Sequence, residues 1–258
     1  MSDPAGTAAD TVSVEVFSDV VCPWCLIGRA RLERVVAAFT AAEGAPAVDV
    51  VYRSFLLEPD APRDRDGSMT EHLVERMGVG PEVVGRMMER VAGIAAGEGL
   101  DVDLSRVRAI SSFDAHRVLR LAHDRGLGRP VKAALMRAHF VEARHLGRPD
   151  ELTEIAAAAG LDAAEVTAIL AGDAYADAVA ADVAAAAAAG VSGVPHFMLA
   201  GPGLPPGERL EVSGAQEAAV LEAALGTAAG EMDRGEPPVR EREQGTGALG
   251  AMRRSGGC

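Results

Sequence analysis

The segment VVCPWC, at residues 20–25, contains two of the three cysteines of the chain, separated by two residues. It follows TVSVEVFSD (11–19), in which valines alternate with polar residues as they do in a β-strand with one buried face. Apolar residues then recur at helical spacing from Cys22 to about Phe39. A second alternating segment, AVDVVYRSF, covers 47–55. The start of the chain therefore predicts a β-α-β unit with the cysteine pair where the first strand passes into the helix.

The middle of the chain has a different pattern. After a stretch rich in Pro, Asp and Gly at 57–67, only helical periodicity is found between 68 and 189, and Gly and Pro divide it into six or seven short helices. Ser68 and Glu71 have the spacing of a capping box at the start of the first one. We expect this segment to form a separate, all-helical part of the molecule.

After this helical segment the pattern returns to strands. VPHFMLA (194–200) and ERLEVSG (208–214) flank a turn rich in Gly and Pro and predict a hairpin, and a last helix is expected from Ala215 to about Ala228. The predicted fold class is therefore α/β, a βαβ–ββα domain with a large helical insertion, because the hairpin extends the sheet that the β-α-β unit starts. The expected parts are the first part of the α/β domain (11–60), the inserted helical domain (61–189), the second part of the α/β domain (190–228) and a disordered tail (229–258).

The composition limits the classes of partner. The chain of 258 residues has 25 Lys and Arg residues against 38 Asp and Glu residues, a net charge of −13, and its single lysine is Lys132. This excess of negative charge opposes binding to nucleic acid or to an anionic membrane. The first residues lack the basic and apolar stretches of a secretory signal, and no segment has the length and hydropathy of a membrane helix. We therefore expect a cytoplasmic protein that binds neither nucleic acid nor membranes.

In the cytoplasm a close pair of cysteines is more often catalytic or metal-binding than a structural disulfide. A structural zinc site needs four ligands, and the chain has no second pair of this kind. His116 and His123 are seven residues apart, and His139 and His145 are six apart, so neither pair has a usual ligand spacing. The third cysteine, Cys258, ends the predicted tail. We therefore predict no metal site.

A redox pair explains the segment better. The attacking group in disulfide exchange is a thiolate, so this cysteine needs a lowered pKa. Cys22, at the first turn of the predicted helix, would receive it from the unpaired backbone N–H groups and the helix dipole. Pro23 suits the first helical position, and Cys25 lies one turn further on, where it can attack a mixed disulfide. We therefore predict Cys22 as nucleophile, Cys25 as resolving thiol, and no cofactor other than the Cys22–Cys25 disulfide, with glutathione as a candidate redox partner.

The proline at the start of the third strand has two interpretations. Val194-Pro195 opens that strand, where proline is tolerated because it cannot donate to a sheet, and this alone would explain it. The predicted fold, however, resembles the thioredoxin superfamily, whose members carry a cis-proline at this point, facing the redox pair. The resemblance implies that the Val194-Pro195 bond is cis and that the backbone of Val194 holds an extended substrate.

A closer resemblance is carried by six segments along the chain. They are SDVVCPWCLIG (18–28), RSFLLEPDAP (53–62), FDAHRVLRLA (113–122), HFVEARHLGRPDELTEIAAAAGL (139–161), GVSGVPHF (190–197) and VSGAQ (212–216). With these segments, from about residue 12 to 226, the chain is similar to the FrnE-like branch of the DsbA family. The resemblance implies a thioredoxin-like fold with an inserted helical domain, and thiol–disulfide oxidoreductase or isomerase activity on protein or small-molecule thiols. The catalytic residues would then be Cys22, Cys25 and Pro195.

Other side chains near the predicted site each have two interpretations. Pro23, Trp24 and Val194 are the candidate substrate-binding residues, with Trp24 as an apolar wall, although packing on a neighbouring loop would also explain Trp24. His196 follows the proline and either tunes the Cys22 thiolate or, more simply, points away along the strand. His116 either faces the active-site groove or, more simply, packs in the core or at a domain interface.

Two other functions fit the same fold. Glutathione-dependent isomerases of the 2-hydroxychromene-2-carboxylate isomerase type and kappa-class glutathione transferases typically carry Ser where Cys22 stands, so the intact CPWC segment argues against them. A non-catalytic binding module would make the cysteines dispensable.

The sequence does not determine the substrate, the direction of electron transfer, the recycling partner or the role of Cys258, and it leaves a homodimer open.

Overall fold

The structure is a computed structural model that describes residues 11–231. Its strands are β1 (Thr11–Ser18), β2 (Ala47–Ser54), β3 (Gly67–Ser68), β4 (Arg108–Ala109), β5 (His196–Ala200) and β6 (Leu210–Ser213). Its helices are α1 (Pro23–Thr40), α2 (Met69–Met77), α3 (Pro81–Gly97), the short η2 (Leu104–Arg106), α4 (Phe113–Asp124), α5 (Gly128–Phe140), α6 (Pro149–Ala158), α7 (Ala163–Ala171), α8 (Ala176–Ala188) and α9 (Ala218–Ala229).

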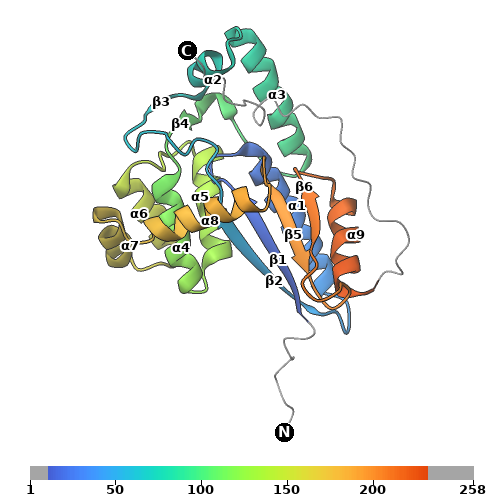
Figure 1. The fold of residues 1–258 in the computed structure, drawn as a ribbon. Helices are drawn as coiled ribbons and strands as arrows, with labels where there is room; N and C mark the ends of the chain where they lie inside the picture. Colours follow the sequence, from blue (N-terminus) through green and yellow to red (C-terminus); the bar gives the residue numbers. More distant parts are fainter. Residues whose placement is uncertain (1–10, 232–258) are drawn as a thin grey trace.

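A four-stranded sheet lies at the centre of the fold, in the order β2-β1-β5-β6 (Figure 1). β1 and β2 are parallel, in register from Thr11↔Ala47 to Ser18↔Ser54, whereas β5 is antiparallel to both β1 and β6. This is the predicted arrangement, a β-α-β unit that a hairpin extends, and the chain has the expected α/β fold. A separate ladder pairs β3 with β4 inside the helical segment. It was not predicted, because two residues per strand leave no alternation to detect.

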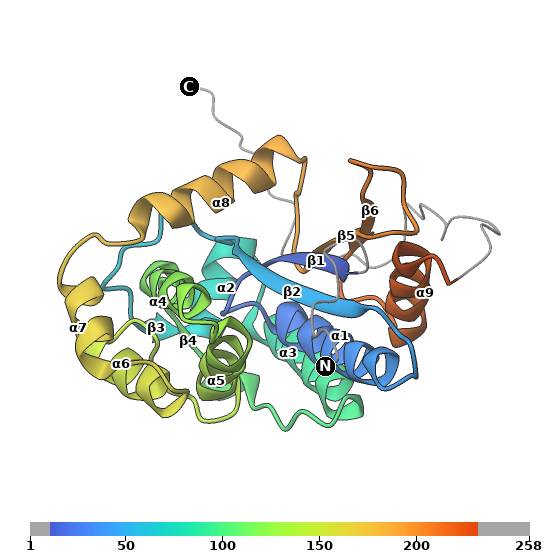
Figure 2. The same cartoon turned by 90° about the horizontal axis from the view of Figure 1, so that it is seen from below.

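The alternation of side chains along β1 assigns the two faces of the sheet. Val12 and Val14 are fully buried in a core that α1 and α9 complete. Phe17 points to the other face, where it packs with Ala186 of α8 and Met198 of β5. Figure 2 shows α1 and α9 on one side of the sheet and α8 on the other. The end of the predicted helical insertion is thus tied to the sheet, while the domain limits themselves stay a prediction.

The helical segment begins as predicted and is fastened to the sheet domain by a buried arginine. Ser68 caps α2, with its Oγ accepting a hydrogen bond from the Glu71 N–H at 3.4 Å. Arg31 of α1, only 5% exposed, donates from Nε to Glu98 Oε1 at 2.6 Å, just after α3 ends. Because this arginine is buried, its contact with Glu98 fixes the end of α3 against α1.

The last helix begins at Ala218, whereas the sequence predicted Ala215. Gly214 has a φ of 82°, in the left-handed region that glycine adopts readily, and its N–H donates to Pro195 O at 2.8 Å. Arg31 Nη1 donates to Ala215 O at 2.8 Å. These contacts hold the backbone before Ala218 in a loop beside the cis-proline segment.

Within residues 11–231, no helix is long and apolar enough to cross a membrane. The same range contains no group of three or more His, Cys, Asp or Glu side chains that could hold a metal ion. Most of the predicted tail, with Cys258, falls on residues 232–258 and lies outside the described residues.

Candidate active site

The two thiols of the CPWC segment lie where β1 passes into α1. Cys22 immediately precedes the first helical residue, Pro23, and its N–H donates to Asp19 O at 3.3 Å. The Leu26 N–H donates to Cys22 O at 3.2 Å and so closes the first turn. Both cysteines are free and buried, Cys22 with 4% and Cys25 with 1% of its surface exposed. The start of α1 therefore holds the two thiols one helical turn apart.

The cis-proline loop lies beside Cys22. The Val194-Pro195 bond is cis, which confirms what the resemblance implied. The loop precedes β5, and β5 is the neighbour of β1 in the sheet. Cys22 Sγ donates to Val194 O over 3.8 Å. Two segments that are far apart in the sequence thus form one site.

Gly28 allows α1 to approach this loop. A Cβ atom at this position would lie 2.7 Å from Pro195 Cγ and 3.3 Å from Phe197 Cζ, the first of which is closer than real Cβ contacts come. The helix and the proline ring therefore meet over the bare backbone of residue 28. Sequence analysis assigned no role to Gly28, although a glycine on the stripe that carries Cys25 was a signal of close approach.

Apolar side chains from both parts of the chain surround the thiols. The buried cluster that holds Cys22 and Cys25 also contains Leu26, Leu104, Val107, Met136 and Phe140, and at its edge lie the half-buried Trp24, Leu57, Met69, Met88, Val91, Leu100, Val102 and Val194. The predicted substrate-binding residues Pro23, Trp24 and Val194 are all partly exposed. Pro23 and Trp24 follow Cys22 in the chain, and Val194 carries the carbonyl oxygen that Cys22 Sγ contacts. All three residues are therefore placed to contact an incoming disulfide, and that role stays a prediction.

A buried acid–imidazole pair anchors the turn before Cys22. Asp19 and His116 are both 0% exposed, and Asp19 Oδ1 lies 3.2 Å from His116 Nε2. Asp19 Oδ2 accepts a hydrogen bond from the Leu57 N–H at 2.9 Å. Burial raises the pKa of Asp19, but the hydrogen bonds and charge of these partners outweigh it and lower the pKa below its usual value. His116, on α4, is thus an interface residue, the simpler of its two interpretations.

A hydrogen bond between the two thiols couples their proton equilibria. The hydrogen bond with Cys25 and burial raise the pKa of Cys22, whose side chain does not cap the helix. For Cys25, burial opposes ionisation, but the hydrogen bond from Cys22 and the cation of Lys132 outweigh it and lower the pKa. In the reduced pair the two thiols therefore share one proton through their hydrogen bond, and the lowered pKa predicted for Cys22 when it meets a substrate stays a prediction.

His196 does not face the thiols. Its Nδ1 lies 3.1 Å from Ser213 Oγ, and its Nε2 lies 3.4 Å from Glu211 Oε2. Both partners are on β6, next to β5 in the sheet. His196 therefore points along the hairpin, as its simpler interpretation held.

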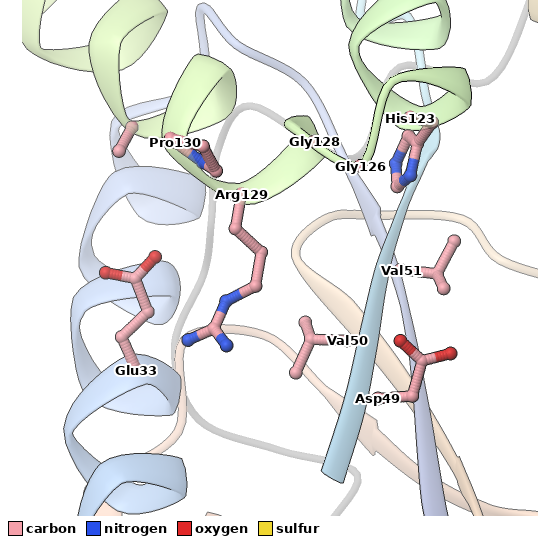
Figure 3. A pocket seen from close by; sticks show the side chains of 10 residues that line it. Glu33, Asp49, Val50, Val51, His123, Gly126, Gly128, Arg129 and Pro130 are labelled. Carbon is pink, nitrogen blue, oxygen red and sulfur yellow. The ribbon is translucent and has the colours of Figure 1, made fainter. Parts of the chain in front are cut away.

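A pocket of about 610 Å³ opens elsewhere, between α1, β2 and the turn from α4 to α5 (Figure 3). Charged groups of both signs line it, among them Glu33, Asp49 and Arg129. His123 also borders it, but its Nε2 is within 2.9 Å of Tyr52 O. None of the predicted site residues lines this pocket, so it is separate from the predicted redox site.

The sequence from residue 13 to 226 matches the family described as the DSBA-like thioredoxin domain. The chain belongs to this family. The DsbA-like fold explains why a cis-proline loop and a cysteine pair meet at one end of the sheet. The family also settles the broad chemistry, and the protein is a disulfide oxidoreductase.

Individual relatives agree with this assignment. A protein described as a probable DsbA oxidoreductase from Streptomyces coelicolor is 38% identical, with a TM-score of 0.77 over 89% of this chain and 94% of that chain. YwbO of Bacillus subtilis is 25% identical over 65% of this chain and 76% of its own length. The fold is shared by the cytosolic disulfide reductase DsbM of Pseudomonas aeruginosa, which is 20% identical with a TM-score of 0.52 over 78% of this chain and 89% of that chain. A structure of DsbM with GSH is 19% identical, with a TM-score of 0.50 over the same shares of both chains. The fold is shared too by a 2-hydroxychromene-2-carboxylate isomerase, which is 14% identical with a TM-score of 0.57 over 83% of this chain and 94% of that chain.

Proposed function

We propose that this DsbA-like protein exchanges disulfides with protein or small-molecule thiols through Cys22, with Cys25 as the resolving thiol. The observation that carries the proposal is the contact of Cys22 Sγ with Val194 O, 3.8 Å apart, at the cis peptide bond. It makes Cys22, rather than Cys25, the sulfur that a chain lying along the cis-proline loop would meet. The partly exposed Trp24 provides apolar surface beside it.

The first step uses the hydrogen bond between the two thiols. The two buried thiols share one proton, and this proton stays on Cys25 when the substrate arrives at Cys22. The Cys22 thiolate then attacks one sulfur of the substrate disulfide, a mixed disulfide forms, and the other substrate sulfur leaves as a thiolate.

The second step resolves the mixed disulfide. Cys25 loses its proton and attacks Cys22 Sγ, so that the Cys22–Cys25 bond forms and the remaining substrate sulfur leaves as a thiolate. Two electrons have then passed from the cysteine pair to the substrate. The same steps in reverse oxidise a substrate dithiol, and the redox poise of the partner decides the direction.

Glutathione is the small-molecule partner that we propose. A disulfide reductase with this fold, DsbM, is known with GSH and is cytosolic, which also favours the cytoplasm as the compartment. The alternative function, a glutathione-dependent isomerase, is favoured by the shared fold of the 2-hydroxychromene-2-carboxylate isomerase. It would not need a second thiol at Cys25, and this difference separates the two functions.

Trapping the intermediate tests the proposal. The Cys25→Ser variant, in a Cys258→Ser background, should accumulate glutathione on Cys22 after exposure to oxidised glutathione, because nothing resolves the mixed disulfide. The matched Cys22→Ser variant should accumulate far less, since its remaining thiol is the more deeply buried one. Intact-mass measurement counts the adduct. Equal adducts on both variants, or an adduct on Cys25 alone, would contradict the assignment of the nucleophile.

A further inference from the structure

We propose that Lys132 is the internal proton acceptor and donor for Cys25 during disulfide exchange. The inference rests on the proposed function and adds a residue that sequence analysis did not place in the site. Lys132 acts through Cys25 and does not contact the substrate. It comes from α5, in the helical segment, whereas both cysteines belong to the start of α1.

Lys132 is buried without a partner. Its side chain is 0% exposed, and Nζ has no hydrogen-bond partner among the described residues. A buried cation normally has a counter-charge, because desolvation of an isolated charge is costly. The nearby carboxylate of Asp19 is engaged by His116 instead. An unpaired ammonium in this place therefore indicates a partner that is charged in only part of the reaction cycle.

The packing of α5 brings Lys132 to the thiols. Met136, one helical turn after Lys132, is fully buried in the same apolar cluster as Cys25. On its other side Nζ lies 5.5 Å from the centre of the Tyr52 ring, on β2. The ammonium thus lies over the Tyr52 ring of β2, one helical turn before a side chain that packs with Cys25. The charged or titratable groups whose fields reach it are Cys25, Asp19, Arg29 and Cys22.

The choice of lysine at this position has a chemical reason. Of the 25 Lys and Arg residues in the chain, only this one is a lysine. Arg keeps its proton under all conditions inside proteins, whereas a buried Lys can release it. Burial lowers the pKa of Lys132 to about 8, although the charges of Cys25 and Asp19 partly oppose the shift. Both protonation states are therefore within reach near neutral pH.

This residue completes the resolving step. When Cys22 attacks the substrate and its proton stays on Cys25, Lys132 loses its counter-charge and gives its own proton to the departing substrate thiolate. As the mixed disulfide is resolved, the proton of Cys25 Sγ passes to the now neutral Nζ of Lys132, and the Cys25 thiolate attacks Cys22 Sγ. In the reverse direction Cys25 leaves the Cys22–Cys25 bond as a thiolate in an apolar environment. The Lys132 ammonium then neutralises it and returns the proton. The protons balance without a further reactant, because the first departing substrate thiolate takes the proton that Lys132 releases, and the Cys25 proton then restores the Lys132 ammonium.

Titration of Cys25 alone tests the inference. A Cys22→Ser, Cys258→Ser protein keeps Cys25 as its single thiol, and its ultraviolet thiolate absorbance is followed against pH after subtraction of the thiol-free triple variant. In this background Lys132→Met should raise the Cys25 midpoint by about one pH unit or more, which is about a tenfold loss of thiolate below the midpoint. Arg137→Gln, which removes a largely exposed cation from the same helix, should leave the midpoint unchanged. An unchanged midpoint with Lys132→Met, or with Lys132→Gln if the methionine variant does not fold, overturns the inference.

The conservative variant separates charge from proton transfer. Lys132→Arg keeps a permanent cation, so it should preserve the low midpoint of Cys25 but slow the release of glutathione from the Cys22 mixed disulfide at neutral pH. Release as fast as in the parent protein would contradict the role in proton transfer. Because the titration uses a protein that cannot form the Cys22–Cys25 bond, it tests Lys132 even if the proposed function fails. Conversely, normal disulfide exchange together with a Cys25 midpoint that Lys132→Met leaves unchanged would contradict this inference but not the proposed function.

Discussion

Replacing Cys22 with serine is expected to abolish catalysed disulfide exchange, leaving the uncatalysed rate. Serine keeps a hydroxyl donor near Val194 O but cannot form a disulfide, so neither the mixed disulfide nor the Cys22–Cys25 bond exists in this variant. Loss of an enzyme's nucleophile typically costs several orders of magnitude in rate. The measurement is the rate at which the protein catalyses reduction of a disulfide-linked peptide by glutathione.

The control for this experiment is Cys258→Ser, which lies outside the described residues and should retain the parent rate. A Cys22→Ser protein that still turns over a glutathione-dependent isomerisation, with no disulfide exchange, would favour the alternative function. Such a result would also reassign the site, since the serine hydroxyl would then act on the glutathione thiol as in the isomerases that carry serine at this point.

Replacing His116 with alanine is expected to lower the free energy of unfolding by about 1–3 kcal/mol, the usual cost of leaving a buried hydrogen-bonding group without its partner. The change leaves the Asp19 carboxylate, which is 0% exposed, without its side-chain partner. Asp19 also accepts the Cys22 N–H through its backbone, so the redox segment should loosen as well. Urea denaturation at neutral pH measures the loss of stability.

The pH dependence of this loss has a defined sign. The pKa of Asp19 is lower in the folded protein than in the unfolded chain, so its contribution is fully present above the unfolded value of about 4. The contribution disappears as the pH falls through the folded value. The difference in stability between the parent and His116→Ala should therefore shrink in acid. In a double-mutant cycle, the combined Asp19→Asn, His116→Ala variant should lose less stability than the sum of the single losses, and simple additivity would contradict the pair.

The chain organisation was readable from the sequence because each signal is local. Alternating valines in 11–19, helical spacing after Cys22 and the strand-start proline at 195 each lie within one element. Together they predicted the position of the two cysteines between β1 and α1, which the structure has. The resemblance added the cis bond. The start of α9 was wrong because contacts from Arg31 and Pro195, both distant in sequence, hold the residues after Gly214 in a loop.

The residues that tune the site were harder to find because they come from separate elements. Lys132 lies in α5 and Asp19 in the turn after β1, and nothing in the sequence shows that they meet around Cys25. A signal for Lys132 was nevertheless present. It shares a helical face with Leu135, Met136 and His139, which are all buried, and a lone lysine on a buried stripe calls for a reason. The pKa of Cys22 depends on its hydrogen bond with Cys25 and on its burial, and the CPWC motif alone does not predict these two effects.

Equilibration in glutathione buffers tests the central claim most directly. The fluorescence of Trp24, the only tryptophan, reports the state of the adjacent thiols, and mass spectrometry of a quenched sample identifies the bonded cysteines. We predict one reversible transition in which Cys22 and Cys25 bond to each other, at a potential within the range from about −270 to about −120 mV that related dithiols span. Absence of a reversible Cys22–Cys25 disulfide across these buffers would contradict the account.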